Sequence, residues 1–158
     1  QVETEEQQRL RFIKEIAPIV QTNKTAPVFS SVIIAQAALE SDFGRSGLAQ
    51  SYHNLFGVKG SDDSNSKELE TQEYVDGEWI TIKDKFRVYE SYGESIADHS
   101  DLFVNGTTWN PAQYQDVLNA KTYQEMAQAL QTDGYATDPD YTDKVISLIE
   151  EYNLTKYD

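Results

Sequence analysis

The chain has 158 residues, 39% of them hydrophobic and 11% aromatic, so it is long enough for one domain with a hydrophobic core and too short for two. Its formal net charge of −14 repels nucleic acid and anionic membrane surfaces, and neither is an expected partner. The absence of cysteine excludes disulfides and thiolate metal sites, and no apolar stretch is long enough to cross a membrane. Because the chain begins with Gln1, we expect a mature piece of a longer protein, from which any export signal has been removed.

The first half of the chain predicts two helices followed by a short helical turn. Residues 3–20 are expected to form a helix with acids in its first turn and apolar residues at helical spacing. These apolar residues are Leu10, Ile13, Ile16 and Val20. A second helix is expected to start near Ser30 or Ser31, either of which can cap it, and to end near Gly44. Residues 46–51 add the short turn.

A β-hairpin is predicted within residues 67–89. Two runs rich in β-branched and aromatic residues flank Asp76 and Gly77, and this dipeptide is the strongest short-range hairpin signal. The segment before it, residues 60–68, is the most loop-like part of the chain. Because an isolated hairpin is marginally stable, we expect it to lean on the helices or to remain mobile.

The second half of the chain predicts helices whose ends are well marked. Three pairs of residues fit a capping box, the pattern that satisfies the first backbone N–H groups of a helix. They are Ser91 with Glu94, Asn110 with Gln113, and Thr122 with Glu125. Pro111 and Pro139 are placed just inside helix starts, Gly134 ends the helix 122–132, and a last helix covers about 138–152. The order of the elements predicts an α+β fold with the hairpin set apart.

No group of residues predicts a metal or cofactor site. His53 and His99 do not form a zinc motif. Asp62, Asp63 and Asn65 are calcium ligands in type, but they lack the EF-hand spacing, which favours a solvated loop. The chain also lacks a glycine-rich phosphate loop and a nucleophilic serine motif. We therefore expect neither a metal nor a cofactor.

Carboxyl groups carry the remaining chemistry, and Glu40 is the first candidate. It follows Ile33 and Ala37 at helical spacing, so it lies near the edge of a buried stripe, where desolvation favours the protonated form. Glycoside hydrolysis usually needs two carboxyl groups, one protonated and one ionised. Glu40 is therefore a candidate acid, although an acid at a helix end is more often structural.

The residues alone do not identify the second carboxyl group. Four glutamates crowd the hairpin, and each also fits a solvated face. They are Glu68, Glu70, Glu73 and Glu78. Aromatic side chains that can stack on sugars are a second open question, because such residues are more often half-buried packing residues. The candidates are Tyr52, Tyr74, Trp79 and Tyr92.

Five motifs occur in register along the chain: AQAALESDFGRSGLA, NLFGVKG, TQEYVDGEW, KFRVYESY and DGYATDPDY. With these motifs the chain resembles the N-acetylglucosaminidase domains of bacterial autolysins and flagellar-rod muramidases, glycoside hydrolase family 73, over residues 10–152. The resemblance implies a lysozyme-like α+β fold, with a mainly helical lobe and one β-hairpin lobe bordering the substrate cleft. It also implies cleavage of the β-1,4 bond between N-acetylglucosamine and N-acetylmuramic acid in peptidoglycan.

The resemblance also assigns roles to individual residues. Glu40 matches the general acid of the family, Glu73 matches the second acid on the hairpin, and Tyr135 matches a tyrosine that supports catalysis in the cleft. Asn54 and Phe56 match the groove beside the acid. The expected substrate-binding residues are Tyr52, Asn54, Phe56, Trp79 and Tyr141.

The mechanism depends on the distance between the two carboxyl groups. A separation of about 6.5–9.5 Å favours inversion, and about 5–5.5 Å favours retention through a covalent intermediate. A larger separation favours help from the N-acetyl group of the substrate. We expect a substrate-assisted route, or one in which the hairpin closes as a lid.

The sequence therefore predicts a single catalytic domain, residues 1–158, of a secreted, cell-wall-associated bacterial endo-β-N-acetylglucosaminidase that needs no cofactor. It is expected to be monomeric and to rely on separate wall-binding modules, because anionic wall polymers repel its charge. A lytic transglycosylase or a muramidase acting on the same polymer is one alternative. A wall-binding module without catalytic activity is another.

Overall fold

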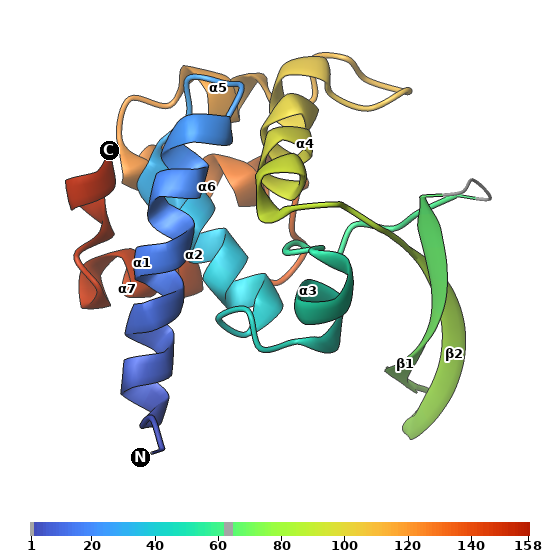
Figure 1. The fold of residues 1–158 in the computed structure, drawn as a ribbon. Coiled ribbons are helices and arrows are strands. Elements are labelled where there is room, and N and C mark those ends of the chain that lie inside the picture. Colours follow the sequence, from blue (N-terminus) through green and yellow to red (C-terminus); the bar gives the residue numbers. More distant parts are fainter. Residues whose placement is uncertain (1, 62–64) are drawn as a thin grey trace.

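The computed structural model describes residues 2–61 and 65–158, where helices are followed by a β-hairpin and then by more helices (Figure 1). The elements are α1 (Glu5–Asn23), α2 (Ser30–Ser41), α3 (Gly47–Tyr52), β1 (Ser66–Val75), β2 (Glu78–Arg87), α4 (Tyr92–Asn105), α5 (Gln115–Asn119), α6 (Tyr123–Thr132), α7 (Tyr141–Glu151) and the 3-10 helix η1 (Leu154–Tyr157). Within the described residues, no helix combines the length and the apolar character needed to cross a membrane. Asp62 and Asp63 of the predicted solvated loop lie outside the described residues.

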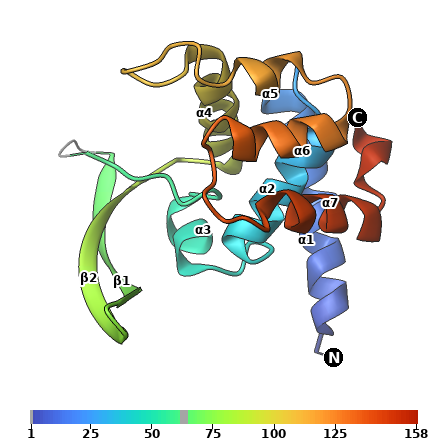
Figure 2. The same ribbon diagram turned by 180° about the vertical axis from the view of Figure 1, so that it is seen from behind.

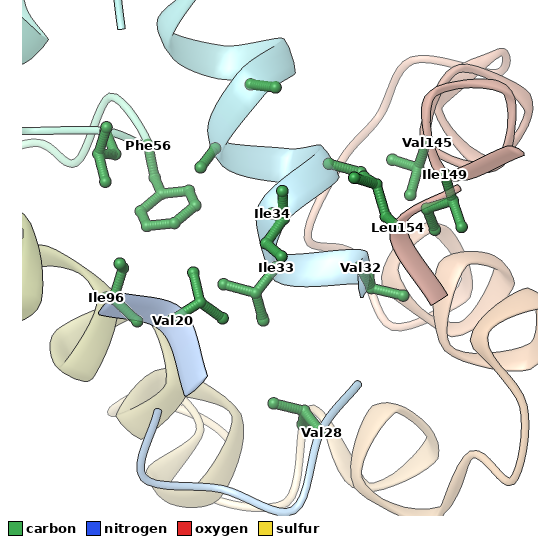
Figure 3. Close-up of a cluster of buried hydrophobic side chains, with 14 of the residues drawn as sticks. Val20, Val28, Val32, Ile33, Ile34, Phe56, Ile96, Val145, Ile149 and Leu154 are labelled. Atoms are coloured by element: carbon green, nitrogen blue, oxygen red, sulfur yellow. The ribbon is translucent and has the colours of Figure 1, made fainter. Parts of the chain in front are cut away.

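Helix α2 is the centre of the hydrophobic core. Every residue from Ser30 to Ala38 is buried, because α1, α6, α7 and η1 pack around the helix. Figure 3 shows Val32, Ile33 and Ile34 of α2 among side chains from α1, α4 and α7. A helix that is apolar on all sides is stable only inside such a shell. The shell ends at Glu40, which is exposed at the C-terminal end of α2.

The predicted serine cap of α2 is wrong. Phe29 occupies the capping position without a side-chain hydrogen bond, and both serines lie inside the helix. The cap comes instead from the other end of the chain. The carboxylate of Asp158 accepts hydrogen bonds of 2.7 Å from both the backbone N–H and the hydroxyl of Ser31. A negative charge at this position also interacts favourably with the helix dipole.

Local sequence patterns predict some of the other helix boundaries correctly and others not. The Ser91 and Thr122 caps are confirmed, since each hydroxyl accepts from the backbone N–H three residues later. The Asn110 cap is wrong: Asn110 stabilises a turn by accepting from the N–H of Ala112, and α5 begins only at Gln115. Both prolines lie before their helices rather than inside them. Leu10 is 41% exposed, and Phe12 takes its place on the buried face of α1.

The hairpin is confirmed around the predicted turn. Val75 lies opposite Glu78, and the residues between them, Asp76 and Gly77, have φ angles of 51° and 82°. Positive φ at both central residues is the twist that a two-residue hairpin turn requires. Pairing continues along both strands to Ser66 and Arg87. The last residues of the predicted loop, 66–68, therefore belong to β1.

The hairpin forms a lobe beside the helices. Figures 1 and 2 show it curving away next to α3, apart from the helical body. Leu69 and Thr71 of β1 and Phe86 of β2 face Leu48 and Tyr52 of α3 across a pocket of about 480 Å³. The predicted α+β architecture, with one helical lobe and one hairpin lobe, is confirmed.

Candidate active site

A sharp turn immediately after Glu40 holds this residue at the end of α2. Asp42, Phe43 and Gly44 all have left-handed backbone conformations, with φ angles of 51°, 55° and 76°. The buried hydroxyl of Ser41 fixes the turn, because it donates to the carbonyl of Ala37 at 2.6 Å and accepts from the N–H of Gly44 at 2.8 Å. The helix therefore ends three residues before the predicted end at Gly44, and Glu40 is its last exposed side chain.

Glu40 lines a pocket of about 450 Å³ with residues of α2, α7 and the loops between them. The other lining residues are Leu39, Phe56, Tyr135, Ala136, Thr137, Asp138, Tyr141 and Lys144. Glu40 is exposed as a whole residue, but its carboxyl group is partly desolvated at the pocket. This desolvation raises the pKa of Glu40, while the positive charge of Lys144 partly opposes the rise. The direction of this shift is the one expected for a carboxyl group at the edge of the buried stripe.

Lys144 lowers the pKa of Glu40 by its positive charge, although it also forms an ion pair with Asp138. Its ammonium group donates to the carboxylate of Asp138 at 2.6 Å, so the pair carries little net charge.

Replacing Lys144 with Gln is expected to raise the pKa of Glu40, because a positive charge is lost and Asp138 is left uncompensated. The Glu40 pKa is measured by NMR titration of its side-chain carboxyl carbon. Lys14→Gln on the exposed face of α1 is the matched control. An unchanged or lower Glu40 pKa in Lys144→Gln contradicts this electrostatic coupling.

Tyr135 forms the wall between the Glu40 pocket and a second pocket of about 290 Å³ that is lined by Asp98 and His99. Its ring packs edge-on against His99, with 5.4 Å between the ring centroids. Burial raises the pKa of the Tyr135 hydroxyl well above its usual range, so the hydroxyl keeps its proton as a hydrogen-bond donor. Glu40 and Tyr135 therefore bring an acid and a neutral donor to one pocket.

The predicted groove residues divide into one pocket residue and one supporting residue. Phe56 lines the Glu40 pocket, and its ring stacks on His99 with 3.8 Å between centroids. Asn54 is buried, and its amide donates to the carbonyls of Val58 and Arg87, both at 2.9 Å. Its oxygen accepts from the N–H of Val58 at 3.0 Å. Asn54 therefore ties the loop that carries Phe56 to the end of β2.

Two hairpin residues of the predicted site, Glu73 and Trp79, have opposite parity in the paired strands. Glu73 lies in β1 opposite Ile80, and its side chain is outside the described part of the structure. It has the same parity in the strand as Leu69 and Thr71, which line the pocket beside Tyr52 together with Glu70 of the opposite parity. Trp79 has the opposite parity: it pairs with Tyr74 on the outer face of the hairpin and is 70% exposed.

Two polar residues that the sequence does not identify lie beneath the Glu40 pocket. Gln36 and His99 are buried, and the imidazole Nε2 of His99 lies 3.0 Å from the amide oxygen of Gln36. The amide nitrogen of Gln36 donates to the hydroxyl of Tyr141 at 3.1 Å. Burial lowers the pKa of His99 to about 3, so its ring is neutral. A glutamine within the small apolar residues of AQAALE was the available signal, because such a buried amide needs partners.

Comparisons with known proteins point to the same chemistry. The glucosaminidase family model, described as mannosyl-glycoprotein endo-beta-N-acetylglucosaminidase, matches residues 17–154. Exo-glucosaminidase LytG of Bacillus subtilis is 52% identical over 131 residues, which are 83% of this chain and 46% of that protein. A probable N-acetylmuramidase of Lactococcus lactis is 40% identical over 154 residues, 93% of this chain and 34% of that protein.

A solved structure matches the whole chain. The catalytic domain of the autolysin Auto from Listeria monocytogenes has a TM-score of 0.87 at 39% identity, and the match covers 100% of this chain and 90% of that one. The chain spans less than half the length of the two curated relatives, and it corresponds to the catalytic part of the autolysin. With a family match over most of its length and an acid-bearing pocket at the end of α2, the chain belongs to the glucosaminidase family, glycoside hydrolase family 73.

Proposed function

We propose that this chain is a peptidoglycan hydrolase, an endo-β-N-acetylglucosaminidase that cuts the β-1,4 bond between N-acetylglucosamine and N-acetylmuramic acid. The observation that carries this proposal is Glu40, a carboxyl group with a raised pKa that opens into a pocket beside Tyr135. A protonated carboxyl group can donate its proton to the glycosidic oxygen as the bond breaks. The neutral hydroxyl of Tyr135 then supports the sugar or an incoming water.

Glu73 is proposed as the second carboxylate, which activates a water or stabilises the oxocarbenium-like transition state. Its support is the resemblance to the family and its place in β1 of the hairpin, opposite Ile80. Because the hairpin is a two-stranded ribbon beside the helical body, we propose that it moves as a lid and sets the separation of the two acids.

Replacing Glu73 with Gln is expected to lower kcat by about 10²-fold or more while changing KM little, since the carboxylate acts mainly in the transition state. Turnover is measured on purified peptidoglycan by the release of new reducing ends. Glu78→Gln, directly after the turn on the same hairpin, is the matched control. Equal kcat values for Glu73→Gln and the wild type would remove Glu73 from the mechanism.

The identity of the bond is tested by product analysis. Purified peptidoglycan is digested, the new ends are reduced with borohydride, and the fragments are weighed by mass spectrometry. Reduced N-acetylglucosamine ends support the proposal. Reduced muramic acid ends indicate a muramidase, an alternative favoured by the 40% identity to a protein described as a probable N-acetylmuramidase. Anhydro ends indicate a lytic transglycosylase, and the absence of fragments indicates a binding module.

We further propose that the domain acts at the bacterial cell wall, outside the cell, as a monomer within a longer protein. The net charge of −14 supports this, because anionic wall polymers repel the isolated domain and another module must supply attachment. Its coverage of less than half of its relatives leaves room for such modules. Binding of intact walls by the isolated domain as tight as that by the full-length protein would contradict the need for another module.

A further inference from the structure

The hydrogen bonds beneath the Glu40 pocket have a defined direction. The amide oxygen of Gln36 can only accept, so the Nε2 of the neutral His99 donates to it. The amide nitrogen of Gln36 can only donate, so the oxygen of Tyr141 accepts from it. The proton of the Tyr141 hydroxyl is therefore not used in this network and is free to point elsewhere.

The surroundings of Tyr141 indicate where that proton goes. Tyr141 is buried, but it lines the Glu40 pocket, and its ring lies 6.2 Å from the ring of Tyr135. Burial raises the pKa of Tyr141 and outweighs the opposite effect of the hydrogen bond from Gln36, so the hydroxyl keeps its proton. The Tyr141 side chain thus borders the pocket with a hydroxyl proton that Gln36 does not use.

The network is also held rigidly. Phe56 stacks on one face of His99, and the rings of Phe103 and Tyr135 pack against its edges at 5.0 and 5.4 Å between centroids. Gln36 is fully buried within α2, four residues before Glu40. Residues four apart on a helix lie on the same face, so Gln36 and Glu40 reach the site from one face of α2.

We propose that Gln36 and His99 are positioning residues that orient the hydroxyl of Tyr141, so that it donates a hydrogen bond to an oxygen of the sugar bound beside Glu40. This inference rests on the proposed function and adds a donor opposite the acid. Since negative charge develops on the departing glycosidic oxygen as the bond to the sugar carbon breaks, a hydrogen bond donated to that oxygen strengthens in the transition state and acts on kcat more than on KM.

The test reverses the hydrogen bond between residue 36 and Tyr141 and keeps the bond that His99 donates. Gln36→Glu replaces the donating amide nitrogen with an acceptor, so the Tyr141 hydroxyl turns its proton away from the pocket towards the new carboxylate. Tyr141→Phe removes the hydroxyl alone. Each variant is expected to lower kcat by about 10–100-fold with KM little changed. The double variant is expected to be no worse than Tyr141→Phe, because Gln36 acts through that hydroxyl.

The controls separate positioning from packing and from the proposed function. Gln128→Glu on the exposed side of α6 is the matched control and is expected to keep the wild-type kcat. If thermal melts show that Gln36→Glu does not fold, Gln36→Met replaces it, with the same expected lack of additivity. A wild-type kcat in Tyr141→Phe, or a further loss in the double variant, overturns the inference. A wild type that releases no reducing ends overturns the proposed function instead.

Discussion

Glu40→Gln is expected to lower kcat on peptidoglycan by about 10²–10⁴-fold, the usual contribution of a general acid. Glutamine keeps the size of the side chain and its place in the pocket, but it cannot donate a proton to the glycosidic oxygen. The loss is measured as the initial rate of reducing-end release at saturating substrate. Glu15→Gln on the exposed face of α1 changes the protein charge equally and is expected to keep the wild-type rate.

The same variant is expected to be more stable than the wild type at neutral pH. Desolvation raises the pKa of Glu40 in the folded state, so ionisation of this group disfavours folding. The wild type therefore loses stability relative to Glu40→Gln as the pH rises from about 4, the ordinary pKa of glutamate, through the raised pKa. Below about pH 4 both side chains are neutral and the difference disappears. Urea unfolding at pH 4 and pH 7 measures it. A variant that is less stable than the wild type at pH 7 would contradict the desolvation of Glu40.

Gly44→Ala is expected to lower the free energy of unfolding by about 2–4 kcal/mol, combining left-handed strain with overpacking. The backbone of Gly44 has a φ of 76°, and an added Cβ would lie 2.7 Å from the ring of Phe12. Phe12 cannot move away easily, because it is buried in the core and packs edge-on against Phe43. The turn that ends α2 beside Glu40 therefore requires glycine. Urea unfolding followed by circular dichroism measures the loss.

Gly47→Ala is the matched control for that experiment. Gly47 lies three residues further on at the start of α3, where an added Cβ meets nothing within 4 Å. It is expected to change the free energy of unfolding by less than about 1 kcal/mol, and in the stabilising direction, because alanine favours helix over glycine. Equal effects of the two substitutions would show that the turn tolerates a side chain.

The features that were predictable from the sequence depend on neighbouring residues. The Asp76-Gly77 turn follows from the backbone preferences of two residues. Each of the caps at Ser91 and Thr122 follows from the residue types within a stretch of four residues. The place of Glu40 at the edge of the buried stripe followed from the apolar run before it. A helix that is buried on all sides has to end where a charged side chain reaches solvent.

The features that were not predictable depend on partners far away in the sequence. The cap of α2 comes from Asp158, 127 residues after Ser31, so either serine looked equally suited to the role. Gln36 meets Tyr141 across 105 residues, and no local pattern announces that pairing. The place of Trp79 on the outer face of the hairpin depends on which face packs on α3, and alternation alone leaves both faces open.

The cap of α2 by Asp158 also fixes the direction in which a following segment leaves the domain. Ser31 and Glu40 lie at opposite ends of α2, nine residues or about 14 Å apart along the helix axis. Any segment joined after Asp158 therefore departs from the far end of the helix that presents the acid. A partner joined through such a segment would therefore be attached away from the end of α2 that carries Glu40.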